Sequence, residues 1–137
     1  MYDDNINFDN WCEIKKTTQK HQRKFYVERG DIVFIKMGKN IGYEQNGKGE
    51  EFLRPVLVFK VFNKNLFLGI ALTSKEKMGK DFLKINFFKK ETIFSSTAIL
   101  MQIKTYDTKR IKYKKGSMRK TDFEELLDYF KNVTLSK

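Results

Sequence analysis

The sequence predicts a mainly β domain in which a small, strongly bent sheet or barrel is closed by one helix near the C-terminus. Residues 54–73 hold two apolar runs on either side of the polar turn Asn63-Lys64-Asn65, a pattern typical of a β-hairpin. Further short apolar runs lie before and after this hairpin, and a capped amphipathic pattern occupies residues 119–132. At 137 residues the chain is long enough to bury the core of one such domain.

Residues 1–28 are expected to form an N-terminal extension, and residues 29–137 the barrel domain. In the extension, Asn7 or Asp9 could cap a short helix. The apolar positions of this helix would be Phe8, Trp11 and Ile14. The following tract, residues 15–24, is polar and shows no apolar stripe. We expect the extension to pack loosely on the body, and an arm that binds a partner is the alternative.

The first strand of the barrel is predicted at residues 32–37, a compact apolar run after Arg29-Gly30-Asp31. Residues 38–53 differ from this strand. Glycines are interspersed with Lys, Asn and Glu, and the apolar residues follow neither the period of 2 of a strand nor the period of 3.6 of a helix. Loops of this length in compact domains are usually functional or disordered. The loop ends immediately before Arg54, so we expect it to lie over the open end of the hairpin as a flap.

The two hairpin strands, at about 54–62 and 66–73, are apolar on both faces and are therefore expected to be central in the sheet. Two later apolar runs, residues 82–88 and 97–103, predict further strands. A single helical or 3₁₀ turn is expected after Thr105.

Residues 109–120 are rich in Lys and Arg. This block could bind a polyphosphate, or it could be a solvated charged face. The helix at 119–132 opens with Thr121-Asp122-Phe123-Glu124, which has the form of a capping box. Its apolar residues follow the i, i+3, i+4, i+7 spacing of a core-facing stripe: Phe123, Leu126, Leu127 and Phe130.

The charge balance favours an anionic partner. The chain has 28 Lys and Arg against 17 Asp and Glu, a net charge of +11, and such a surplus favours polyanions, above all nucleic acid. A solvated, lysine-rich surface is the alternative explanation. The 13 Phe and six Tyr supply enough bulky apolar material to exclude a disordered chain.

The chain has one cysteine and one histidine, which excludes several kinds of catalytic and metal site. With only one cysteine, Cys12, the chain can form neither an intramolecular disulfide nor a multi-cysteine zinc site. Because Cys12 follows Trp11 in an apolar patch, we expect a buried structural thiol. His21 is the only histidine, which rules out a nuclease with two catalytic histidines. No apolar run resembles a signal peptide or a membrane span, so we expect a cytoplasmic protein without a membrane partner.

The hairpin also brings polar side chains together. Folding about Asn63-Lys64-Asn65 sets Arg54 opposite Thr73 or Ser74, and opposed Cβ atoms lie roughly 4.5–5.5 Å apart. A guanidinium beside two hydroxyls is a group suited to phosphate. The alternative is structural: Arg54 would pair with a glutamate of the preceding loop, Glu50 or Glu51, and Thr73 would cap a strand.

Five segments occur in a fixed order over residues 29–132: Arg29-Gly30-Asp31-Ile32-Val33, Gly42-Tyr43-Glu44-Gln45, Arg54-Pro55-Val56-Leu57-Val58, Ala71-Leu72-Thr73-Ser74 and Gln102-Ile103-Lys104-Thr105-Tyr106-Asp107. Together they resemble the MazF/PemK toxins of type II toxin–antitoxin systems. The resemblance implies an SH3-like barrel of the MazF/PemK/CcdB type with a C-terminal helix, and a homodimer. It also implies sequence-specific cleavage of single-stranded RNA in the cytoplasm, and a small cognate antitoxin protein that occludes the RNA groove. We expect neither a metal nor a cofactor.

By the same resemblance, Arg54 and Thr73 are the catalytic pair, and Glu44 and Gln45 lie in the flap that borders the groove. The candidate RNA-binding residues are Tyr43, Glu44, Gln45, Ser74 and Lys75. Arg54 suits the stabilisation of charge on the phosphorus oxygens, because its donors form a fixed, permanently charged fork. Neither Arg nor Thr is a good base at neutral pH, so water, Glu44 or charge stabilisation alone would have to serve the proton transfer.

The chain departs from the family pattern in three places. Residues 46–53 lengthen the flap, Met101 stands where some relatives have an acidic residue, and residues 1–28 have no counterpart in the compact members. Met101 and the longer flap keep open a catalytically inactive RNA-binding barrel. A gyrase-poisoning toxin of the same fold, like CcdB, is a further alternative, and the paired Arg54 and Thr73 argue against it because a gyrase poison needs no such pair.

Overall fold

The computed structural model describes residues 4–20, 25–38, 47–48 and 52–135. In this part of the chain, six antiparallel strands close into a barrel in the order β1-β2-β3-β5-β4-β6. The elements are α1 (Asp4–Lys20), β1 (Asp31–Lys36), β2 (Leu53–Val61), β3 (Leu66–Thr73), β4 (Phe82–Lys89), β5 (Thr92–Asp107), the 3₁₀ turn η1 (Thr108–Arg110), β6 (Ile111–Ser117) and α2 (Lys120–Leu135).

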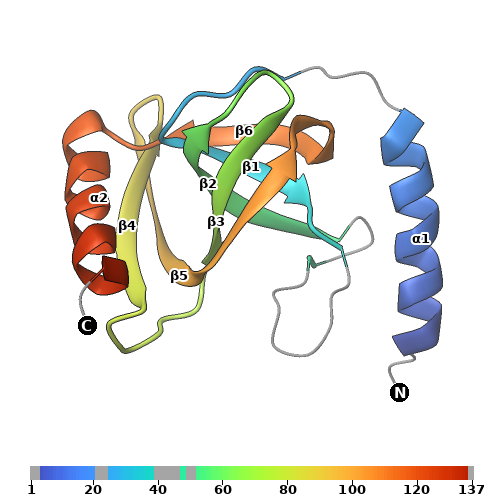
Figure 1. Cartoon of the computed structure of the whole chain (residues 1–137), viewed down its shortest axis with the longest axis horizontal. Helices are drawn as coiled ribbons and strands as arrows, with labels where there is room; N and C mark the ends of the chain where they lie inside the picture. The colour runs from blue at the N-terminus through green and yellow to red at the C-terminus, as the bar shows by residue number, and fades with distance from the viewer. Residues whose placement is uncertain (1–3, 21–24, 39–46, 49–51, 136–137) are drawn as a thin grey trace.

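The two helices lie on opposite sides of this barrel (Figure 1). Helix α2 packs beside β4, whereas α1 stands on the far side of the molecule, next to η1. The barrel with a C-terminal helix and an N-terminal helix confirms the fold class that the sequence predicts. No helix in the described ranges has the length and apolarity that a bilayer crossing requires.

The hairpin of β2 and β3 has the expected turn and register. The Asn63 side-chain Oδ1 accepts hydrogen bonds from the backbone N–H groups of Asn65 (2.8 Å) and Leu66 (3.0 Å), which closes the turn without a glycine. A bulge after Val58 shifts the pairing by one residue, and Val56 then pairs with Ala71. Continued by two residues, this register sets Arg54 against Thr73 and not against Ser74.

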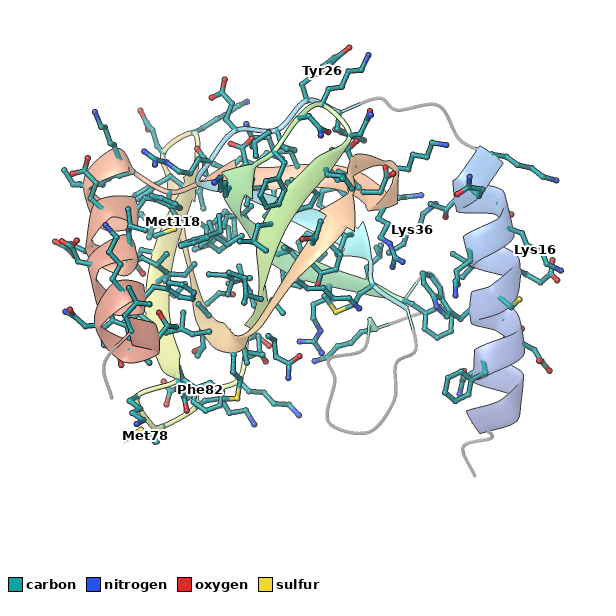
Figure 2. All side chains as sticks on the ribbon, in the orientation of Figure 1. Lys16, Tyr26, Lys36, Met78, Phe82 and Met118 are labelled. Atoms are coloured by element: carbon teal, nitrogen blue, oxygen red, sulfur yellow. The ribbon has the colours of Figure 1, made fainter. Side chains whose placement is uncertain are left out.

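The central strands are buried on both faces, as predicted, because they separate two hydrophobic clusters. The α2-side cluster includes Ile32, Leu57, Ile70, Leu72 and Leu126. The second cluster includes Val33, Val56, Val58, Ala71 and Tyr106. Adjacent residues of a strand point to opposite faces, so β1, β2 and β3 contribute to both clusters. In Figure 2, Met118 lies on the α2 side of the barrel, where it belongs to the first cluster.

Two strands differ from the sequence-based expectation. Strand β5 begins at Thr92, not at residue 97, and it forms a hairpin with β4 before it continues along β3. The tight turn between β4 and β5 uses Lys90 at φ 55, a left-handed conformation for which the sequence offers no glycine or asparagine. Strand β6 runs through the basic block, where its exposed lysines hide the strand pattern. The 3₁₀ turn expected after Thr105 is present at residues 108–110.

Helix α1 extends to Lys20, beyond the short helix expected. Trp11 and Thr18, seven residues apart on one face, are buried. Cys12 is exposed, so the expectation of a buried thiol was wrong, because the residue after Trp11 is turned about 100° around the helix. In Figure 2, Lys16 projects from the outer face of α1, whereas Lys36 lies between the barrel and the helix.

The packing of α2 gives a stability prediction. Leu126 is 1% exposed in the α2-side cluster, so Leu126→Ala should lower the free energy of unfolding by about 2–5 kcal/mol. Leu135→Ala is the matched control, because Leu135 ends the same helix and is 79% exposed. Urea denaturation of the three proteins measures the difference. Equal losses in the two variants would contradict this account of how α2 is held.

Candidate active site

The register of the hairpin brings Arg54 and Thr73 together. Arg54 is the second residue of β2 and Thr73 is the last of β3. The Arg54 Nη1 donates a hydrogen bond of 3.1 Å to the backbone carbonyl of Leu72, the neighbour of Thr73. Both side chains are largely shielded from solvent, with exposed fractions of 8% for Arg54 and 5% for Thr73.

These side chains nevertheless face an open pocket. A cavity of about 400 Å³ is lined by Phe34, Lys48, Leu53, Arg54, Pro55, Leu72, Thr73, Ser74, Phe87, Phe94, Ser95, Ser96 and Lys115. The lining residues include three hydroxyls from serine, one from threonine, and three cationic side chains. A buried cation beside hydroxyl donors, in a cavity of this size, suits an anionic ligand that carries an aromatic or apolar group.

The hydroxyl of Thr73 is oriented by the chain that follows it. Its Oγ1 accepts a hydrogen bond of 3.2 Å from the backbone N–H of Lys75. A hydroxyl oxygen that accepts in this way keeps its own hydrogen for donation to another acceptor. Across the sheet, Thr73 pairs with Thr97 of β5, which fixes the end of β3 on its other side.

Burial shapes the electrostatics of the site. Desolvation lowers the pKa of Arg54 from its ordinary value, and the nearby Tyr106 acts in the opposite direction. An arginine starts so far above neutrality that it stays charged, and its low-dielectric surroundings strengthen its attraction for an anion. Burial raises the pKa of Tyr106 to about 12, although Arg110 and Arg54 both oppose that rise. Tyr106 is therefore a neutral phenol at physiological pH.

Several lining residues were not found by sequence reasoning, because they come from strands β1, β4, β5 and β6. Phe87 and Phe94 stack with ring centroids 5.4 Å apart, and the Lys115 ammonium lies 4.2 Å from the Phe94 centroid. Phe34 stacks on Tyr113 at 4.9 Å. The strand that begins at Thr92 carries Phe94, Ser95 and Ser96 to the pocket, and no residue type in the turn before it signals that start.

The other predicted site residues have different outcomes. Ser74 is exposed and lines the pocket, whereas Lys75 contributes its backbone to Thr73 and its side chain is not among the lining groups. Tyr43, Glu44 and Gln45 lie outside the described residues. So do Glu50 and Glu51, the partners that the structural alternative assigns to Arg54. In the described ranges, no group of three or more His, Cys, Asp or Glu could hold a metal ion.

A comparison with protein families agrees with the geometry. The model of the PemK-like, MazF-like toxin of type II toxin–antitoxin systems matches residues 28–134. The chain belongs to this family. The match confirms the resemblance predicted from the five sequence segments, and it begins after α1. A comparison with curated protein sequences gives no match.

Solved structures with a similar fold include two mycobacterial proteins. One is an endoribonuclease in complex with its cognate antitoxin from a mycobacterial species, with a TM-score of 0.58 and 10% sequence identity, over 81% of this chain and 97% of that chain. The other is an endoribonuclease from a mycobacterial species, with a TM-score of 0.56 and 8% identity, over 81% of this chain and 93% of that chain. At such identities the likeness shows that this PemK/MazF-like toxin shares their fold.

The buried phenol of Tyr106 predicts a pH dependence of stability. Its pKa of about 12 exceeds the ordinary 10, so the unfolded chain releases this proton at lower pH than the folded protein does. The stabilisation of the folded state by protonated Tyr106 is fully present below about pH 10. As the pH rises towards 12 this stabilisation is lost, and the free energy of unfolding falls by roughly 2–3 kcal/mol in all. Unfolding free energies from pH 9 to 11.5 should fall less steeply in Tyr106→Phe than in the wild type. Tyr26→Phe, at an 84% exposed tyrosine, should keep the wild-type slope, and an unchanged slope in Tyr106→Phe would contradict the assignment.

Proposed function

We propose that this toxin is an endoribonuclease that cleaves single-stranded RNA at the pocket beside the open end of the β2–β3 hairpin. The observation that carries the proposal is that Arg54 and Thr73, both buried, line one open cavity, with the Arg54 guanidinium hydrogen-bonded to the carbonyl of the residue before Thr73. The two similar solved structures are both endoribonucleases, and the family to which the chain belongs consists of toxins, which supports the proposal.

The reaction is an internal transesterification. The ribose 2′-oxygen loses its proton and attacks phosphorus, the bond to the 5′-oxygen breaks, and that oxygen takes up a proton as a 2′,3′-cyclic phosphate forms. Negative charge grows on the phosphorus oxygens in the transition state, so preorganised donors there lower the barrier. Arg54 would supply a planar, charged fork to two of these oxygens. Thr73 and Ser74 would donate from their hydroxyls to the same oxygens, or position the 2′-hydroxyl.

Proton transfer would be the slow part of this chemistry. Among the described residues, the pocket lining includes no histidine, aspartate or glutamate. Water, or Glu44 of the flap, would serve as the base. The cationic side chains of the pocket would stabilise the negative charge that grows on the phosphorus oxygens. We therefore expect metal-independent catalysis that is slow and dominated by electrostatic stabilisation.

The remaining lining groups would hold the strand of RNA. Single strands bind where aromatic rings accept stacked bases and cations follow the phosphates. Phe34 offers such a ring at the pocket, and Lys48 and Lys115 offer the charge. Tyr43, Gln45 and Lys75 are proposed as further RNA contacts, on the resemblance of their segments to the family.

The proposal extends to partners and location. We propose that a cognate antitoxin, encoded nearby, occludes the pocket, that the toxin is a homodimer, and that it acts in the cytoplasm. One of the similar solved structures is an endoribonuclease bound to its cognate antitoxin, which supports the first of these statements. The net charge of +11 suits an acidic antitoxin segment as well as RNA.

Conservative substitutions test the catalytic pair. Arg54→Lys removes the two-oxygen fork but keeps the charge, and Thr73→Val removes the hydroxyl but keeps the shape. Each should lower kcat for a long single-stranded RNA by roughly 10²–10³, the usual loss for one donor of this kind. Arg29→Lys and Thr92→Val are matched controls at exposed positions outside the pocket lining and should keep wild-type rates. Gel analysis of the cleavage products measures all five proteins.

The same assay separates the alternative functions. Binding of RNA by the wild type without cleavage would overturn the endoribonuclease and favour the inactive RNA-binding barrel. Intact RNA together with capture of gyrase would favour a poison of the CcdB type. Cleavage that persists in both Arg54→Lys and Thr73→Val would place the chemistry elsewhere.

Lys115 should act in binding and not in the chemical step. Its ammonium lies over the Phe94 ring at the pocket, so Lys115→Ala should raise KM several-fold with little change in kcat. If this ammonium contacts a phosphate, the salt dependence of binding should lose about one unit of slope. Lys131→Ala, at an exposed position of α2, is the control. An equal effect of the two substitutions would show that only overall charge matters.

A further inference from the structure

Helix α1, which precedes the part of the chain shared with the family, contacts the barrel through the only tryptophan of the chain. Trp11 is 6% exposed. Its ring lies 5.7 Å from the Phe52 ring and 5.8 Å from the Arg110 guanidinium. On Gly38, an added Cβ would lie 1.9 Å from the nearest indole atom. The indole therefore occupies the space that any side chain at position 38 would need.

Gly38 and Phe52 are joined by their backbones. The N–H groups of Met37 and Gly38 both donate to the Phe52 carbonyl, at 3.0 Å and 3.2 Å. Trp11 thus packs on two residues that stand side by side in space although 13 residues separate them in the sequence. Because the indole contacts Gly38 and Phe52 at the same time, it holds this backbone junction against the end of the barrel.

The backbone conformation of Phe52 needs support from its surroundings. It is buried and has φ 55, a left-handed conformation that is unfavourable for a bulky residue. Residues in this region persist when the surrounding structure holds them there. Without the indole, a cavity would open beside the Phe52 ring, and the backbone could relax towards the extended region.

Such relaxation would reach the pocket at once. Leu53 and Arg54 follow Phe52 directly, and both line the cavity. Both are also paired with β1, and the hydrogen bonds from Met37 and Gly38 to Phe52 continue that ladder by one step. If this last step frays, the end of the ladder that carries Leu53 and Arg54 can shift relative to Leu72 and Thr73 of β3. Displacements of about 1 Å in an active site can lower a rate by about 10²-fold.

We infer that Trp11 is a positioning residue for the cleavage reaction: from helix α1 it holds the Phe52 junction and thereby the orientation of Arg54. The inference rests on the proposed function. Two further contacts keep the helix in place, from the Lys36 ammonium to the Thr18 hydroxyl (3.3 Å) and from the Lys109 ammonium to the Gln19 carbonyl (3.0 Å).

Steady-state kinetics of the full chain test this inference. Trp11→Ala should lower kcat for single-stranded RNA by about 10- to 100-fold, with a smaller change in KM, because the substrate-binding rings and lysines are untouched. Trp11→Phe should recover most of the rate, since a second aromatic ring can still pack on Phe52. Phe8→Ala, at a 41% exposed aromatic residue of the same helix, is the control and should behave like the wild type.

A second readout does not depend on cleavage. The Nε–H resonance of Arg54 in nuclear magnetic resonance spectra should shift in Trp11→Ala, shift less in Trp11→Phe and stay unchanged in Phe8→Ala. Circular dichroism at the assay temperature shows whether Trp11→Ala is folded. If it is not, the same two measurements on Trp11→Phe decide, with a smaller fall in kcat and a smaller shift expected.

The outcomes separate this inference from the proposed function. A wild type that cuts RNA, together with folded Trp11 variants of equal kcat and unshifted Arg54 resonance, overturns the positioning role and leaves the proposed function intact. A wild type that does not cut RNA overturns the proposed function. The Arg54 resonance then still tests whether Trp11 and Arg54 are coupled.

Discussion

The hydrogen bond from Arg54 to the Leu72 carbonyl ties the candidate site to the fold. Arg54 is only 8% exposed, and its guanidinium must have polar partners, since an uncompensated buried charge is strongly destabilising. The backbone of β3 provides one, and it is available only because the β2–β3 register brings the two strand ends together. The register in turn depends on the Asn63 turn and on a bulge after Val58. Local turn chemistry thus determines where the charged group meets the hydroxyl of Thr73.

The barrel that holds this hairpin leaves the strand ends open while it buries the strand centres. Val56 to Val58 and Ile70 to Leu72 pack into the two clusters on opposite faces. At one end, residues from β1, β4, β5 and β6 surround the pair with aromatic rings, hydroxyls and the Lys115 side chain. The proposed catalytic pair comes from the hairpin, and the remaining walls come from distant strands. Because the pair and the walls come from different strands, a wall residue can be substituted without moving Arg54 or Thr73.

Sequence reasoning succeeded where the signal is local and failed where it depends on tertiary structure. The turn of Asn63, the apolar strands and the spacing of Phe123 and Leu126 are read from neighbouring residues. The start of β5 was missed because Lys90 adopts a left-handed conformation that its residue type does not announce. Strand β6 was missed because its lysines resemble a solvated face. The pocket walls Phe34, Phe94 and Lys115 could not be assembled without the closure of the barrel, which joins residues far apart in the sequence.

The central claim is that Arg54 and Thr73 share one phosphate. A structure of the toxin with an RNA that carries a 2′-deoxy substitution at the cleaved nucleotide, and so cannot react, tests it most directly. The account predicts that one phosphate accepts hydrogen bonds of about 2.7–3.0 Å from the Arg54 guanidinium and from the Thr73 Oγ1. An RNA bound on another face of the barrel, or in this pocket with no phosphate near Arg54, would contradict it.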